Sequence, residues 1–131
     1  MSVFVQIGST QAKLAHRNEA RRVAKRIVII MVKHIILWTL KPELTGAERQ
    51  TVLTDIKKGL EGLVGIVPGL VDVHVQIDNR IDTSNCDLML DCTLESEQAL
   101  RDYAVHPAHV AVANGKVRPF TIQRVCLDYT I

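Results

Sequence analysis

Residues 32–40, Val-Lys-His-Ile-Ile-Leu-Trp-Thr-Leu, decide the fold, because they predict a β-strand that is apolar on both of its faces. Their β-branched and aromatic side chains are typical of strands. Alternate side chains of a strand point to opposite sides, which places His34, Ile36, Trp38 and Leu40 on one face and Lys33, Ile35, Leu37 and Thr39 on the other. A sheet built around this strand therefore needs a cover on each side.

A helix is predicted directly after this strand. Lys41-Pro42 ends the strand, and Thr45-Gly-Ala-Glu48 matches a capping box, in which the Thr hydroxyl and the Glu carboxylate bond to free amides at a helix start. Apolar residues then recur at helical spacing up to the Pro68-Gly69 turn. They are Val52, Leu53, Ile56, Leu60, Leu63 and Val64.

The rest of the chain predicts three strands and a broken helix. Residues 70–77 alternate, with Val71, Val73, Val75 and Ile77 on one face, and residues 86–94 alternate after a polar loop. A helix capped by Ser96 breaks before Pro107, and residues 117–129 form the last strand. The order β-α-β-β-α-β predicts an α+β, ferredoxin-like subunit with a four-stranded antiparallel sheet and its helices on one face. Since no helix is left for the open face, we expect that face to pack against a second copy in a homodimer.

Composition limits the function classes. A chain of 131 residues forms one domain, so separate cofactor and substrate domains are excluded. The net charge of +2 divides into +5 for residues 1–30 and −3 for residues 31–131, so the folded part lacks the basic face of a nucleic-acid binder. Three cysteines without C-x-x-C spacing indicate neither disulfides nor zinc and favour a reducing, cytoplasmic setting. The longest apolar run, residues 27–32, is too short to cross a membrane.

The chain divides at Met31. Upstream, residues 1–30 are rich in Arg and Lys but show no sustained apolar stripe, which favours a poorly ordered basic extension. A functional arm and a transit peptide are the alternatives. Regular patterning begins at once downstream, which makes residues 31–131 the domain.

Chemistry-bearing side chains gather in Tyr103-Ala-Val-His106-Pro107-Ala-His109. If the inner face of the first strand meets the helices, His34 approaches Tyr103 and His109 at an apolar cleft. A neutral imidazole can accept a proton near neutral pH, and a tyrosine can donate a hydrogen bond to a carbonyl or an enolate. The alternative is structural, since a histidine before proline often bonds to a helix end and a tyrosine often fills the core.

At several separate motifs the chain resembles the stress-responsive A/B barrel domain (Dabb) family. The motifs are Met31–Lys41, Ile66-Val-Pro68-Gly69-Leu, Cys86-Asp-Leu-Met-Leu-Asp, Tyr103–His109 and Val125-Cys-Leu-Asp128-Tyr129. The resemblance covers residues 31–131 and implies a dimeric α+β barrel. One branch of the family contains polyketide cyclases, which close a poly-β-keto chain by aldol chemistry without an organic cofactor. There the residues matching His34, Tyr103 and His109 line the substrate site, with His109 as the base.

The resemblance also carries finer expectations. We expect substrate contacts at His34, Trp38, Leu60, Tyr103 and His106. The cyclases place a tyrosine where this chain has Leu60, which argues against the same substrate. Some plant relatives imply a magnesium ion on main-chain carbonyls matching Val64, Val67 and Leu70.

The sequence is compatible with two main functions. One is a cofactor-independent enzyme that performs aldol cyclisation or isomerisation on a small carbonyl or polyketide-like compound. The other is a non-catalytic, stress-related or ligand-binding dimer. A monooxygenase acting on quinol-like substrates is suggested by fold analogy alone.

Overall fold

The computed structural model describes residues 11–18 and 30–131. Residues 11–18 form a short helix whose side chains are exposed. Residues 1–10 and 19–29 of the predicted basic extension lie outside the described residues. Among the described helices, none has the length and apolar character that a membrane crossing requires.

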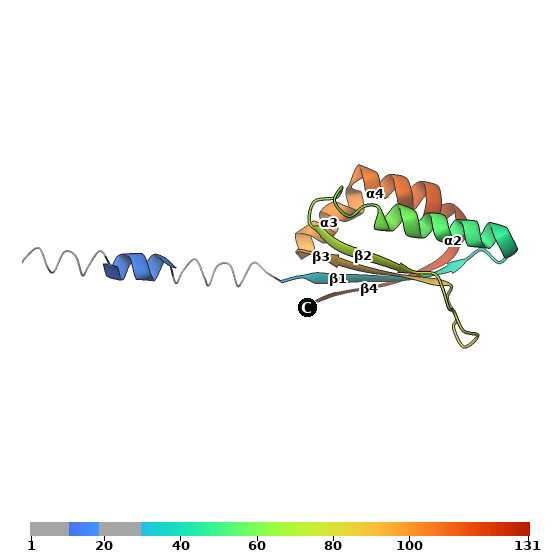
Figure 1. Ribbon diagram of the computed structural model, residues 1–131, viewed down its shortest axis with the longest axis horizontal. Helices are drawn as coiled ribbons and strands as arrows, with labels where there is room; N and C mark the ends of the chain where they lie inside the picture. Colours follow the sequence, from blue (N-terminus) through green and yellow to red (C-terminus); the bar gives the residue numbers. More distant parts are fainter. Residues whose placement is uncertain (1–10, 19–29) are drawn as a thin grey trace, which may run out of the picture. The chain divides into compact units, whose positions relative to one another are not determined.

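One four-stranded sheet organises residues 31–131 (Figure 1). Its strands are β1 (Val32–Leu40), β2 (Leu70–Gln76), β3 (Leu88–Leu94) and β4 (Thr121–Thr130). They lie in the order β2-β3-β1-β4, and each neighbouring pair is antiparallel. The predicted ferredoxin-like order is therefore confirmed, with β1 at the centre because it pairs with both β3 and β4.

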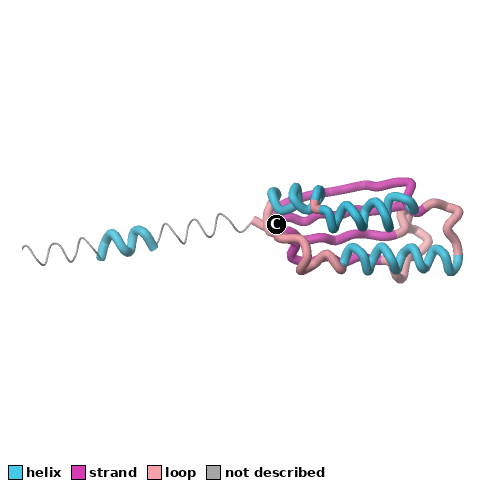
Figure 2. Tube along the Cα trace, turned by 90° about the horizontal axis from the view of Figure 1, so that it is seen from above, coloured by secondary structure: helices cyan, strands magenta, loops and turns pink. Residues whose placement is uncertain are grey.

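The helices lie on one face of this sheet. They are α2 (Gly46–Glu61), α3 (Glu97–Val105) and α4 (Pro107–Val112), followed by a π-helical turn at Ala113–Val117 and a 3-10 turn at Arg118–Phe120. Figure 2 shows α2 and the α3–α4 segment side by side across that face. They approach closely at Gly59 of α2, where an added Cβ would lie 3.0 Å from a Val112 methyl.

The core lies between the helices and the inner face of the sheet. In β1 the inner residues Ile36, Trp38 and Leu40 are at most 5% exposed, as the alternation predicts. Helix α2 contributes Val52, Leu53, Ile56 and Leu60, which are all buried. Burial of such side chains stabilises a domain by about 1.5–3 kcal/mol each.

Two local expectations are corrected. Thr45 occupies the N-cap of α2, but its hydroxyl makes no capping hydrogen bond, so the predicted capping box does not form. Val71 is 42% exposed, although simple alternation placed it with Val73 and Val75. The pairing of β2 with β3 shifts register between Leu70 and Asp72, and this irregularity turns Leu70 inward in place of Val71.

The outer face of the sheet carries exposed apolar side chains. Leu37 of β1 and Val125, Leu127 and Tyr129 of β4 are between 36% and 63% exposed. Register pairs Leu37 with Val125, so these side chains form one continuous strip across β1 and β4. We call these four residues the outer strip.

Asp87 ties three segments together just before β3. Its carboxylate accepts the Leu40 N–H at 2.8 Å and an Arg49 N–H at 2.9 Å, and Arg80 lies 3.6 Å away. Partial burial raises the pKa of Asp87, but the Leu40 bond and the two guanidinium groups outweigh it, and the net shift is downward. The carboxylate therefore stays charged and holds the loop, β1 and α2 in position.

Candidate functional site

A pocket of about 370 Å³ lies between the sheet and the helical layer. Its walls come from β1, α2, β3, α3, α4 and β4. Its lining residues include His34, Trp38, Leu60, Tyr103, His109, Arg118 and Arg124. This volume is in the usual range for a small-molecule site.

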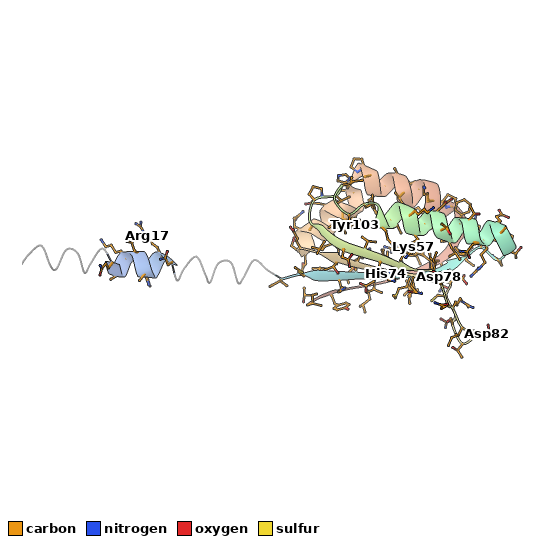
Figure 3. The ribbon with its side chains drawn as sticks, viewed as in Figure 1. Arg17, Lys57, His74, Asp78, Asp82 and Tyr103 are labelled. Carbon is orange, nitrogen blue, oxygen red and sulfur yellow. The ribbon has the colours of Figure 1, made fainter. Side chains whose placement is uncertain are left out.

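Tyr103 places a phenol at the buried side of this pocket. It lies on α3, is 1% exposed, and stands between the helical layer and the sheet (Figure 3). Within the described part of the chain, its hydroxyl is buried without any hydrogen-bond partner. Burial also raises the pKa of Tyr103, so the group remains a neutral O–H donor. Such an unpaired donor is an unusual feature of a folded protein and is suited to a ligand oxygen.

His109 stands beside this phenol because the helix breaks at Pro107. Ala108, which would donate to the Ala104 carbonyl in an unbroken helix, donates instead to the ring of His106. The Ala104 carbonyl faces Nδ1 of His109 at 3.3 Å. Since a carbonyl can only accept, the neutral ring carries its proton on Nδ1 and its lone pair on Nε2.

The surroundings of His109 favour its neutral form. Its ring centroid lies 4.2 Å from that of Tyr103. Burial lowers the pKa of His109, and the charges of His34, Arg118 and Arg124 act in the same direction against the Ala104 hydrogen bond. His109 is therefore a neutral base at pH 7, with Nε2 as its basic atom.

His34 approaches the same cluster from β1. Its side chain is 8% exposed, and its ring centroid lies 6.2 Å from Tyr103 in an edge-on arrangement. Nδ1 of His34 bonds to the Asp128 carboxylate, which directly opposes it in the β1–β4 register. Cys126 is also close, with Sγ 3.6 Å from Nδ1. The three predicted groups, His34, Tyr103 and His109, therefore do converge.

Of the other predicted substrate contacts, two line the pocket and one does not. Trp38 and Leu60 line the pocket as apolar walls. The structure does not bring His106 to the pocket, because its Nδ1 accepts the Ala108 N–H at 3.1 Å and caps α4. The break before Pro107 uses this imidazole for the helix start, which is the structural alternative that the sequence left open.

The backbone around residues 64–70 offers little to magnesium. The Val67 carbonyl already accepts the Leu70 N–H at 3.3 Å. Among the described residues, no group of carboxylates, imidazoles or thiols with metal-ligand spacing forms there. Proteins usually bind Mg²⁺ through carboxylates and waters, so this donor set fits the ion poorly. A magnesium ion on Val64, Val67 and Leu70 stays a prediction.

The sequence did not indicate a role at the site for Asp128, Arg118 or Arg124. Arg118 and Arg124 line the pocket at its 3-10 turn and β4 side. The signal for Asp128 was its place opposite His34, which becomes visible only once β1 and β4 are paired in register. The arginines gave no sequence signal, because spacing alone does not show that β4 borders a cavity.

These features define a ferredoxin-like α+β protein with a buried tyrosine-histidine pocket. The family model described as Stress responsive A/B Barrel Domain matches residues 32–131, and the chain belongs to this family. The family inferred from the sequence motifs is thus confirmed.

Three relatives illustrate what the chain is similar to. Olivetolic acid cyclase from Cannabis sativa is 30% identical over 101 residues, which cover 76% of this chain and 95% of the cyclase. A dimeric protein of unknown function with a ferredoxin-like fold from Bacteroides fragilis is 26% identical, with a TM-score of 0.71, covering 77% of this chain and 96% of its own. Hydroxynitrile lyase from Passiflora edulis is 18% identical, with a TM-score of 0.61 over 79% of this chain and 94% of the lyase, and shares the fold.

Proposed function

We propose that this protein is a cofactor-independent catalyst of proton transfer on a small carbonyl compound, with His109 as general base and Tyr103 as hydrogen-bond donor. The observation that carries the proposal is the buried Tyr103 hydroxyl, which has no hydrogen-bond partner among the described residues and lies beside a neutral His109 in a pocket. Leaving such a hydroxyl unpaired costs about 1–3 kcal/mol, which a bound carbonyl oxygen would recover. The similarity to a cyclase supports carbonyl chemistry of this kind.

The proposed step uses the two groups in concert. Nε2 of His109 removes a proton from the carbon next to the substrate carbonyl, and the released electron pair moves onto the carbonyl oxygen. The Tyr103 O–H donates to that oxygen as negative charge develops on it. In an aldol cyclisation the enolate then attacks a second carbonyl of the same chain, and the His109 imidazolium returns its proton to the alkoxide that forms. In an isomerisation the imidazolium instead returns the proton to a carbon of the enolate. His34, held by Asp128, orients the substrate.

Leu60 makes a substrate different from that of the known cyclase branch the better fit. Its apolar side chain is 2% exposed and lines the pocket where that branch is expected to carry a second phenol. One polar anchor is therefore replaced by an apolar wall. We propose a substrate with an apolar group at this position.

Exchange of carbon-bound hydrogen tests this function without knowledge of the substrate. A panel of alkyl and aryl methyl ketones, with and without a carboxylate group, is incubated in D₂O, and loss of the α-hydrogen signal is followed by NMR. His109→Gln should slow exchange by about 10²–10⁴-fold, the usual contribution of a general base. His74→Gln, an exposed histidine of β2 outside the pocket, is the matched control. No exchange above buffer across the panel, or full activity of His109→Gln, would overturn the proposal.

A non-catalytic role is the second candidate, and one contact favours it. The His109 bond to the Ala104 carbonyl bridges the break between α3 and α4, so the imidazole also has a structural use. If this is its only role, His109→Gln should lower the melting temperature, and neither the parent protein nor the variant should catalyse hydrogen exchange. The catalytic role predicts a large loss of exchange with comparatively little change in melting.

We further propose that the protein acts as a homodimer through the outer strip. Its four apolar side chains are exposed on a face that no helix of the described domain covers. The similar Bacteroides fragilis protein is described as dimeric, which supports a second copy as the cover. Leu127→Arg should yield a monomer in light scattering, whereas Ile81→Arg, in a loop and 67% exposed, should not. A parent protein that is monomeric at micromolar concentration would refute this assignment.

A further inference from the structure

Positive charge gathers at one side of the pocket. Arg118 and Arg124 are among its lining residues, and none of the described residues that line it is an Asp or a Glu. This contrasts with residues 31–131 as a whole, which carry a net charge of −3. The positive side is therefore a local feature of the cavity and not a reflection of the overall charge.

Register explains why Arg124 belongs to this cavity. It opposes Trp38 in the β1–β4 ladder, and directly paired residues carry their side chains on the same face. Trp38 faces the helical layer and lines the pocket, so Arg124 lies on that face too. Arg118 comes from the 3-10 turn directly before β4.

Neither guanidinium has a carboxylate partner among the described residues. In residues 11–18 and 30–131, every ion pair found involves other cations, and Arg118 hydrogen-bonds to the uncharged amide of Asn114. Other exposed arginines of the domain are paired, as Arg101 is with Glu97 at 3.9 Å. Their charge also reaches the proposed base, because both arginines help to lower the pKa of His109. An anion in the pocket would relieve this repulsion.

We propose that the pocket selects carbonyl compounds that carry a carboxylate, bound by Arg124 with Arg118 beside it, while the carbonyl end reaches Tyr103 and His109. This inference rests on the proposed function and names its substrate class, a keto acid. The planar guanidinium fork matches a carboxylate and gives a charge-assisted pair. A pocket of about 370 Å³ has room for both ends of such a molecule.

Binding of two probes of nearly equal shape tests the inference. The probes are 3-benzoylpropanoate and its primary amide, titrated calorimetrically into the full chain at low salt. We expect the carboxylate to bind about tenfold more tightly, a difference of about 1.4 kcal/mol. Arg124→Gln should remove most of this preference, because it weakens binding of the carboxylate far more than binding of the amide. Added salt should weaken the carboxylate only.

The control variant is Arg101→Gln, an exposed arginine outside this pocket, which should keep the preference. Equal binding of the two probes by the parent protein, no binding of either, or an unchanged preference in Arg124→Gln would overturn the inference. Because binding is read without turnover, its failure is separate from that of the proposed function. Hydrogen exchange on neutral ketones without carboxylate preference refutes only the inference, whereas preference without any exchange refutes only the catalysis.

Discussion

Replacement of Tyr103 by phenylalanine should stabilise the fold while it impairs the chemistry. The ring is 1% exposed and fills the core, but its hydroxyl has no partner among the described residues. An unpaired buried hydroxyl costs about 1–3 kcal/mol, so its removal should raise the free energy of unfolding by about 1 kcal/mol. Hydrogen exchange on a bound ketone should fall, because the enolate oxygen loses its donor.

Urea unfolding followed by Trp38 fluorescence and by circular dichroism measures this change. All variants are compared at one protomer concentration, because dimer formation shifts apparent stability. Tyr103→Ala is the matched variant, and it should lose about 3–5 kcal/mol because it also removes the ring. If Tyr103→Phe instead loses about 1 kcal/mol or more, the hydroxyl is bonded within the protein. The reasoning that reserves it for a ligand would then fail.

Three further predictions concern other parts of the domain. Burial lowers the pKa of His109 below its ordinary 6.5, so on acidification the unfolded chain takes up this proton first. Stability should therefore fall as the pH drops through about 6.5 and below in denaturant titrations, and His109→Gln should flatten that slope. Asp87→Ala removes the acceptor of the Leu40 N–H and of Arg49, and should lower the free energy of unfolding by about 2 kcal/mol in urea, against no measurable change for an exposed surface control. Gly69→Ala should lower the melting temperature, because Gly69 has φ +80° and an added Cβ would lie 2.7 Å from that of Ala99; an unchanged melting temperature would contradict this steric argument.

Side-chain periodicity was sufficient to predict most of the fold. The double-faced pattern of residues 32–40 predicted a strand with two covers, and this strand is central in the sheet. Periodicity failed at Val71, because a register irregularity in the β2–β3 pair is a property of two strands together. It also did not show that the Thr45 hydroxyl makes no cap, since hydroxyl bonding depends on side-chain geometry.

Part of the candidate site could likewise be predicted from the sequence, and part could not. His34, Tyr103 and His109 could be found from the sequence because their residue types and the proline break carry chemical meaning before any contact is known. The sequence could not show that His106 caps the helix whereas His109 lines the pocket. These roles depend on where each ring points after the break at Pro107.

By itself, the sequence determined the elements, their order, the family motifs and the polar cluster, because these follow from local propensity and spacing. Only the tertiary structure decided that Asp128 holds His34, that the Tyr103 hydroxyl has no partner in the described part of the chain, and that two arginines border the cavity. Each of these depends on side chains brought together by the pairing of β1 with β4 or by the packing of helices on the sheet. Such contacts join residues far apart along the chain, and no local pattern encodes them.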